Sequence, residues 1–229
     1  MPDPSAADPS GPHPGGLGLS AAGLSAAGPS VAGPSGAGSS VAGPSIADAV
    51  ALATWAHNGQ LDKAGEAYIG HPLRVMETVG RTAAGAGVDV AHARMAAILH
   101  DVVEDSDLTV TGLATAGYPS EVVAAVDALS HRDGEPVECY LARVAADRIA
   151  VVVKRADMAD NSDPVRLARL PAERARELTI RYAGRRRLLD DLVVRNNAVV
   201  RSNAAARRLP GNGPAAGGPQ DHGAGHEGS

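Results

Sequence analysis

The segment LHDVVED, residues 99–105, places one histidine and three acids in a run that is otherwise apolar. Acidic side chains are almost never fully buried unless they are paired or bind a metal. His100 and Glu104 are four residues apart, a spacing that puts both on one face of a helix. Asp101 and Asp105 repeat that spacing. His100 and Asp101 can therefore offer a nitrogen and an oxygen to one cation, with two acids one turn away that could handle a bound water.

Two further segments carry residues that could complete such a site. AYIGHPLRV places His71 at the expected start of a helix, and VVKRADMADN places Asp157 and Asn161 four apart after an apolar approach. Each has a structural alternative, because a histidine can cap a helix and polar residues are common at helix ends. Together, two imidazoles and two carboxylates form a mixed N/O set that suits Mn²⁺, Fe²⁺ or Zn²⁺ (His71, His100, Asp101 and Asp157).

The elements that must position these residues are predicted to be helices throughout, which makes the fold all-α. Apolar residues recur at helical spacing, and no stretch alternates as a strand over six residues. Ser45, three residues before Asp48, is predicted to cap the first helix. IAVVV (149–153) is assigned to a helix because the helical spacing continues into the residues that follow it. Helices are predicted at roughly 46–57, 72–84, 89–104, 110–116, 119–130, 136–147, 148–160 and 171–205.

Both ends of the chain are of low complexity. From Gly18 a five-residue unit repeats six times, and its recurrent Gly and Pro break both helix and strand. Residues 1–45 are therefore predicted to be a disordered arm, either a repeat expansion without a role or a tail for assembly. Residues 209–229 are predicted to be a disordered Gly/Pro-rich tail. Residues 46–208 remain as one helical domain, long enough for a single core.

Composition narrows the class of function and the compartment. The net charge of −5 disfavours non-specific binding to nucleic acid or to an anionic membrane. The chain shows no signal peptide and no apolar run long enough to span a bilayer. A single cysteine, Cys139, fits a reducing cytoplasm. The chain has no Phe and one Trp, so the core must be aliphatic, with Trp55 and Cys139 expected inside it and His57 expected to be a satisfied histidine at a helix end.

The motifs AHNGQLDKAGEAYIGHP, ILHDVVEDSDLT and VVKRADMADN resemble those of the HD-domain metal-dependent phosphohydrolases. The resemblance covers roughly residues 46–190 and is strongest to the branch that hydrolyses the alarmones (p)ppGpp. That family is an all-α helical bundle. An HD dipeptide alone is weak evidence, whereas this ordered set of motifs is specific.

The resemblance implies a role for each matching residue. The family's metal ligands fall on the four residues identified above, and the family ion is usually Mn²⁺. The acids that serve hydrolysis fall on Glu104 and Asp105. Asn161, Lys63 and, more loosely, Tyr182 match residues near the nucleotide. The implied reaction is hydrolysis of (p)ppGpp to pyrophosphate and GDP or GTP.

Two departures from the family pattern keep other readings open. Asp62 stands where alarmone hydrolases carry an arginine, and a carboxylate there repels a polyphosphate and cannot stack on guanine. The chain also ends before a synthetase domain. The alternatives are a phosphohydrolase for another nucleotide or phosphoester, and a nucleotide-sensing module without turnover. The oligomeric state stays open.

Overall fold

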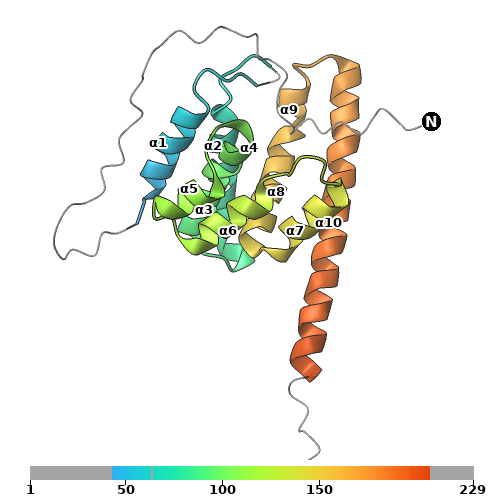
Figure 1. The fold of residues 1–229 in the computed structure, drawn as a ribbon. Helices are drawn as coiled ribbons and strands as arrows, with labels where there is room; N and C mark the ends of the chain where they lie inside the picture. The colour runs from blue at the N-terminus through green and yellow to red at the C-terminus, as the bar shows by residue number, and fades with distance from the viewer. Residues whose placement is uncertain (1–42, 63, 207–229) are drawn as a thin grey trace, which may run out of the picture.

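The computed structural model describes residues 43–62 and 64–206, and it is helical, as predicted (Figure 1). The first helices are α1 (Ile46–Ala56), α2 (Gly70–Thr82), the 3-10 turn η1 (Ala84–Ala86), α3 (Val90–Leu99), α4 (Val102–Asp105) and α5 (Val110–Thr115). They are followed by α6 (Ser120–Leu129), α7 (Val137–Ala146), α8 (Arg148–Asn161), α9 (Pro164–Leu167) and α10 (Ala172–Ala206). The described residues contain no strand, only one isolated bridge between Leu61 and Ala67. Most of the predicted arm and the whole predicted tail lie outside the described residues.

Two helices form the centre of the domain. In α3, six of the ten residues are buried, from Ala93 to Leu99, and α8 is buried almost continuously from Ile149 to Met158. Helices that are apolar on all sides belong inside a fold rather than on its surface. α3 packs against α1, α2, α6 and α8, while α8 also packs against α2, α6, α7 and α10. The chemistry-bearing residues at the ends of α3 and α8 are thereby held on a rigid framework.

Small alanine side chains explain how the helices pack closely in a core without phenylalanine. Ala49 and Ala53 of α1 and Ala96 and Ala97 of α3 are fully buried, and small side chains let helix axes approach closely. The cap predicted at Ser45 is confirmed, because Ser45 Oγ accepts from Asp48 N at 3.3 Å, and Asp48 Oδ2 completes a capping box by accepting from Ser45 N at 2.8 Å.

The structure corrects the prediction of one helix over 89–104. That segment is broken at His100 and Asp101, where Asp101 has φ −106° and ψ −5°. At the break, His100 Nδ1 lies 2.7 Å from the Ala97 carbonyl oxygen, which it engages as a donor. The break turns the two chemically active side chains out of the regular helix. The short helix α9, capped by Asp163, was also not predicted.

Two predictions about the core are wrong. Trp55 is 52% exposed, because it follows the buried Ala53 by two residues and so points to nearly the opposite face of α1. Cys139 is exposed and lies outside the buried set Tyr140, Leu141 and Val144.

α10 contributes Leu178, Tyr182 and Leu189 to the core, and its C-terminal part extends past the other helices (Figure 1). None of the described helices is long and apolar enough to cross a membrane.

Candidate metal centre

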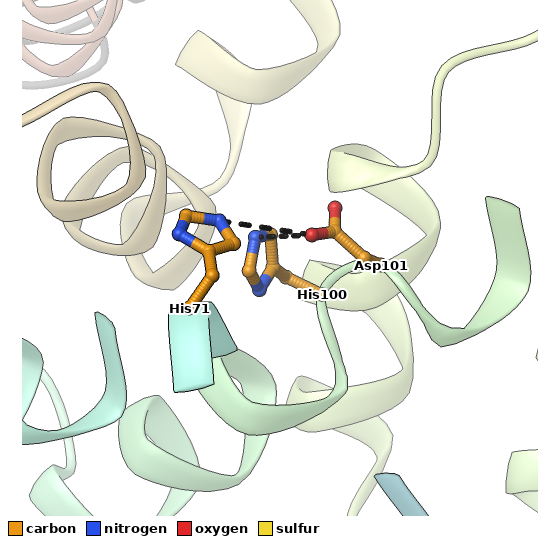
Figure 2. A group of neighbouring side chains, drawn as sticks. All are labelled: His71, His100 and Asp101. Carbon is orange, nitrogen blue, oxygen red and sulfur yellow. Dashed lines mark ion pairs between the residues drawn. The ribbon is translucent and has the colours of Figure 1, made fainter. Parts of the chain in front are cut away.

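Three helix ends bring the predicted ligands together. His71 lies in the first turn of α2, His100 and Asp101 follow α3, and Asp157 lies in the last part of α8. Figure 2 shows the His71 and His100 rings and the Asp101 carboxylate turned toward one another. One ligand atom from each of these three residues lies within 4.8 Å of the others, a spacing that could hold a metal ion.

The distances within the cluster are short and involve both histidines. His100 Nε2 lies 2.9 Å from Asp101 Oδ2, and His71 Nε2 lies 3.8 Å from the same oxygen. Asp157 Oδ1 lies 3.2 Å from His71 Nε2 and 3.9 Å from His100 Nε2. All four predicted ligands therefore converge, with Asp157 beside the group formed by the other three.

The donor set fits a cation on chemical grounds. His100 donates through Nδ1 to a backbone carbonyl, so its Nε2 is left to act as an acceptor when the ring is neutral. That Nε2 is buried and makes no hydrogen bond. It faces carboxylate oxygens, which are also acceptors. Acceptors that meet in a buried space need a positive charge among them, either a proton or a metal ion.

The pKa values of the predicted ligands also indicate that positive charge is stabilised in the cluster. Burial lowers the pKa of His71, but hydrogen bonds to Asp157 and Asp160 outweigh it and raise that pKa to about 10. Burial raises the pKa of Asp101, yet the neighbouring His100 and His71 together outweigh burial and hold that pKa below its usual range. For Asp157, burial likewise raises the pKa, but Lys154, His71 and His100 together outweigh burial and keep the pKa well below normal.

Further contacts hold the two carboxylate ligands in place. Lys154 Nζ lies 2.9 Å from Asp157 Oδ2, so it binds the oxygen that does not face His71. Asn161 Nδ2 donates to Asp157 Oδ1 at 2.5 Å, and the Tyr68 hydroxyl donates to Asp101 Oδ2 at 2.6 Å. Neither Tyr68 nor Lys154 was predicted to have a role, although both lie within the motifs that resemble the family.

The two predicted catalytic acids, Glu104 and Asp105, lie in α4, next to the cluster. Burial, followed by the negative charge of Asp101, raises the pKa of Glu104 to about 8. The same two causes raise the pKa of Asp105 to about 6. Glu104 Oε1 accepts from the His131 backbone N–H at 2.7 Å, and this contact fixes the carboxyl group. Perturbed acids beside a metal-like cluster are typical of catalytic sites.

His57 and Gln60 connect the first motif to this region. His57 ends α1 as predicted, with Nδ1 2.8 Å from Gln60 Oε1, and it is only 2% exposed. Its Nε2 is nevertheless buried without a hydrogen-bond partner, so this histidine is only partly satisfied. Gln60 Nε2 donates to the Asp105 carbonyl at 2.7 Å and thereby ties α1 to the segment that carries the acids.

A pocket lies beside the cluster on the side of Asn161. Its lining combines three leucines with five polar residues (Leu167, Leu170, Leu178, Asp62, Glu66, Asn161, Arg166 and Arg169) together with Ala64. Asn161 lines this pocket and also contacts Asp157, so it stands between the pocket and the metal cluster. Contact between Asn161 and a substrate stays a prediction.

The Asp62 carboxylate lines the pocket but its charge is paired. Its side chain is 9% exposed, and Oδ2 lies 3.1 Å from the Arg166 guanidinium. Oδ1 accepts from the backbone N–H groups of Ala64 at 2.9 Å and Glu66 at 3.0 Å. The carboxylate is thus occupied with its own turn and with Arg166, and Glu66 is paired in the same way with Arg169.

The other two predicted substrate residues are less informative. Tyr182 lies on α10 and is 3% exposed, packed within the core. Lys63 lies outside the described residues. Their contact with a substrate stays a prediction.

Comparison with known proteins agrees with this geometry. Residues 68–162 match the HD domain family, a range that contains all four predicted metal ligands. A probable GTP pyrophosphokinase of Mycobacterium leprae (strain TN) is 32% identical over 135 residues, which span 55% of this chain and 16% of that protein. A solved structure of a metazoan ortholog of SpoT, reported to hydrolyse ppGpp and to act in starvation responses, is 21% identical with a TM-score of 0.52. It covers 71% of this chain and 98% of its own, and at this identity the likeness shows a shared fold.

Proposed function

Since the chain carries an HD domain at residues 68–162, we propose that it is a metal-dependent phosphohydrolase whose substrate is the alarmone (p)ppGpp. The proposed reaction is attack of water on the 3′-diphosphate, which releases pyrophosphate and leaves GDP or GTP. Mn²⁺ is the proposed ion.

One observation carries this proposal. Two buried imidazole nitrogens and two carboxylate oxygens converge within 4 Å contacts, and two acids with raised pKa values lie beside them. A purely structural ion-pair network would not need two further acids whose pKa values are raised toward neutral pH. A hydrolytic site needs both a cation and a proton acceptor.

The proposed ligands are His71, His100 and Asp101, with Asp157 completing the set. A divalent ion held by them would supply a Lewis acid that lowers the pKa of water and offsets the charge on a phosphoryl group. Lys154 neutralises the far oxygen of Asp157, and Tyr68 orients Asp101, so these two residues keep the ligands in position.

The acids would manage the protons. Asp105, whose pKa of about 6 leaves it largely ionised near neutrality, would accept a proton from the attacking water. As that water oxygen bonds to phosphorus, the bond from phosphorus to the ribose 3′-oxygen breaks. The leaving oxygen takes up a proton, which Glu104 can donate because its pKa of about 8 keeps it protonated near neutrality, while the His131 N–H fixes its other oxygen.

The pocket supports a nucleotide as the substrate. The pocket is lined by both polar and apolar side chains, and the Asn161 amide offers both a donor and an acceptor at the edge nearest the cluster. One similar protein named above is a probable GTP pyrophosphokinase, and the other is reported to hydrolyse ppGpp. Both activities favour a guanine nucleotide as the substrate of this chain.

The test is release of pyrophosphate from ppGpp by the purified protein with Mn²⁺, compared with an EDTA-treated sample and with a panel of other nucleotides. Metal-dependent release from ppGpp supports the proposal. Turnover of a different nucleotide would keep the chemistry and replace the substrate. Metal binding without turnover of any compound would favour the sensing module.

A further inference from the structure

Asp160 lies three residues after the predicted ligand Asp157 on α8, and it faces α2. Its Oδ2 lies 2.7 Å from His71 Nδ1, the ring nitrogen on the side away from the metal cluster. The side chain is 12% exposed, so this contact is largely shielded from water. Asp160 belongs to none of the ligands or acids discussed above, yet it touches one of those ligands directly.

Two arginines fix this carboxylate from other directions. Arg74 donates through Nε to Oδ1 at 2.8 Å and through an Nη to Oδ2 at 3.1 Å. Arg166 donates to Oδ2 from α9. A fork of two parallel hydrogen bonds holds a carboxylate in one orientation, and the two positive charges favour its ionised form.

This arrangement determines which nitrogen of His71 is available. An ionised carboxylate only accepts hydrogen bonds, so Nδ1 must carry the proton in the 2.7 Å contact. Nε2 is then the nitrogen directed at Asp101 and Asp157. A carboxylate behind a ligating histidine fixes the ring and raises its strength as a ligand.

His100 provides an internal comparison. Its Nδ1 is held by the Ala97 carbonyl, a backbone group that no substitution removes. His71 depends instead on a side chain 89 residues away in sequence. The orientation of one imidazole is therefore built into α3, whereas the other depends on α2 and α8 meeting correctly.

We infer that Asp160 is a positioning residue that orients His71 for metal binding, held in place by Arg74 and Arg166. This inference rests on the metal centre of the proposed function. Arg166 also binds Asp62, so one arginine joins the support of a metal ligand to the wall of the pocket.

The experiment measures the affinity for Mn²⁺ by isothermal titration calorimetry in the full chain and in Asp160→Ala and Asp160→Asn. The alanine variant should bind Mn²⁺ about 10- to 100-fold more weakly. The asparagine variant keeps an acceptor for Nδ1–H without the charge and should lose less. Asp190→Asn is the matched control, because Asp190 is also a carboxylate paired with an arginine, but on the exposed face of α10.

A second readout separates positioning from a general loss of structure. In Zn²⁺-loaded protein, ¹H–¹⁵N spectra of the His71 ring should show the proton on Nδ1 in the wild type and in Asp160→Asn. In Asp160→Ala this preference should be lost. Thermal unfolding identifies any variant that does not fold. If Asp160→Ala does not fold, the Mn²⁺ affinity of Asp160→Asn alone tests the inference.

The outcomes distinguish this inference from the proposed function. Unchanged Mn²⁺ affinity and an unchanged His71 tautomer in a folded Asp160 variant would overturn the inference and leave the hydrolase proposal standing. Weakened binding in the variants of a protein that hydrolyses no nucleotide would support the inference and overturn the proposed function. A wild-type chain that binds none of Mn²⁺, Fe²⁺ or Zn²⁺ would overturn both.

Discussion

The Lys154 ammonium lies 2.9 Å from Asp157 Oδ2, inside the domain and on the oxygen opposite to the one that faces His71. Lys154 is 6% exposed, and its Nζ also lies 5.1 Å from the centre of the Tyr140 ring. A buried lysine needs such partners, because an unpaired charge in a low-dielectric interior is costly. Helix α8 therefore carries one buried positive charge that stabilises the Asp157 carboxylate in the absence of an ion.

Lys154→Met should strongly destabilise the metal-free protein. The substitution leaves the Asp157 charge buried without its lysine, and removing one partner of a buried pair costs about 3–5 kcal/mol. Urea denaturation with EDTA measures the loss. Added Mn²⁺ should recover part of it, since the ion would replace the missing positive charge.

The neighbouring Arg155 gives a matched control for this prediction. Its ion pair with Asp190 is exposed, so Arg155→Met should change the free energy of unfolding by less than about 1 kcal/mol. Equal losses in the two variants would show that the Lys154–Asp157 pair has no special role in stability.

Asp101→Ala and Glu104→Gln should separate metal binding from turnover. Asp101 contacts both imidazoles of the cluster, so its loss should remove both Mn²⁺ binding and hydrolysis. Glu104 contacts the His131 backbone N–H, a bond that glutamine retains, so the variant should bind Mn²⁺ normally. Its turnover should fall by about 10²- to 10⁴-fold, the usual contribution of a general acid or base.

Calorimetry for the ion and pyrophosphate release for turnover test this pair of variants. Exposed Asp127→Asn serves as the control and should match the wild type in both measurements. A Glu104→Gln variant that hydrolyses as fast as the wild type would remove Glu104 from the mechanism.

The raised pKa of Glu104 should also make the stability of the metal-free protein depend on pH. The folded protein holds this proton up to a pKa of about 8, whereas an unfolded chain releases it near 4.5. Protonation therefore favours folding below pH 4.5, and this contribution is lost as the pH rises from 4.5 to 8. Glu104→Gln cannot lose a proton and should escape the effect.

Thermal unfolding with EDTA at pH 5 and pH 8 measures this difference. The melting temperatures of the wild type and Glu104→Gln should be similar at pH 5, and at pH 8 the variant should melt several degrees higher. A gap that is equal at both pH values would mean that Glu104 does not titrate in this range in the folded protein.

The sequence predicted the helices better than it predicted what lies between them. The cap formed by Ser45 with Asp48 is a local signal, and it located the start of α1 correctly. The break at His100 and Asp101 was missed because apolar residues continue at helical spacing on both sides of it. The exposure of Trp55 was missed because a tryptophan was assumed to be buried, although Ala49 and Ala53 already define the buried face of α1.

The candidate site shows the same division between local and tertiary information. The types and spacing of His71, His100 and Asp101 predicted a cluster, and the structure brings these residues together. Asp160 was not predicted, because nothing in its own segment points to His71. Their contact exists only because α2 and α8 pack side by side, and packing between distant segments cannot be read from spacing.

Asp62→Asn should tighten binding of an anionic nucleotide if the pocket receives one. Asparagine keeps the Oδ1 that accepts from the Ala64 and Glu66 N–H groups, so the turn should persist. It removes a negative charge from the pocket wall and places an amide where Arg166 now finds a carboxylate oxygen. Both changes favour phosphate, so KM for ppGpp should fall roughly two- to fivefold while kcat stays the same.

Steady-state kinetics of pyrophosphate release at two salt concentrations check this prediction. The fall in KM should shrink at high salt, because screening weakens charge interactions at the pocket mouth. Asp190→Asn removes the same charge at a distance and should leave KM unchanged. An Asp62→Asn variant with an unaltered KM would mean either that the phosphates bind elsewhere or that the pairing with Arg166 already cancels the Asp62 charge. A parallel Arg166→Gln variant separates these two cases. Its KM should rise only if the phosphates bind in this pocket.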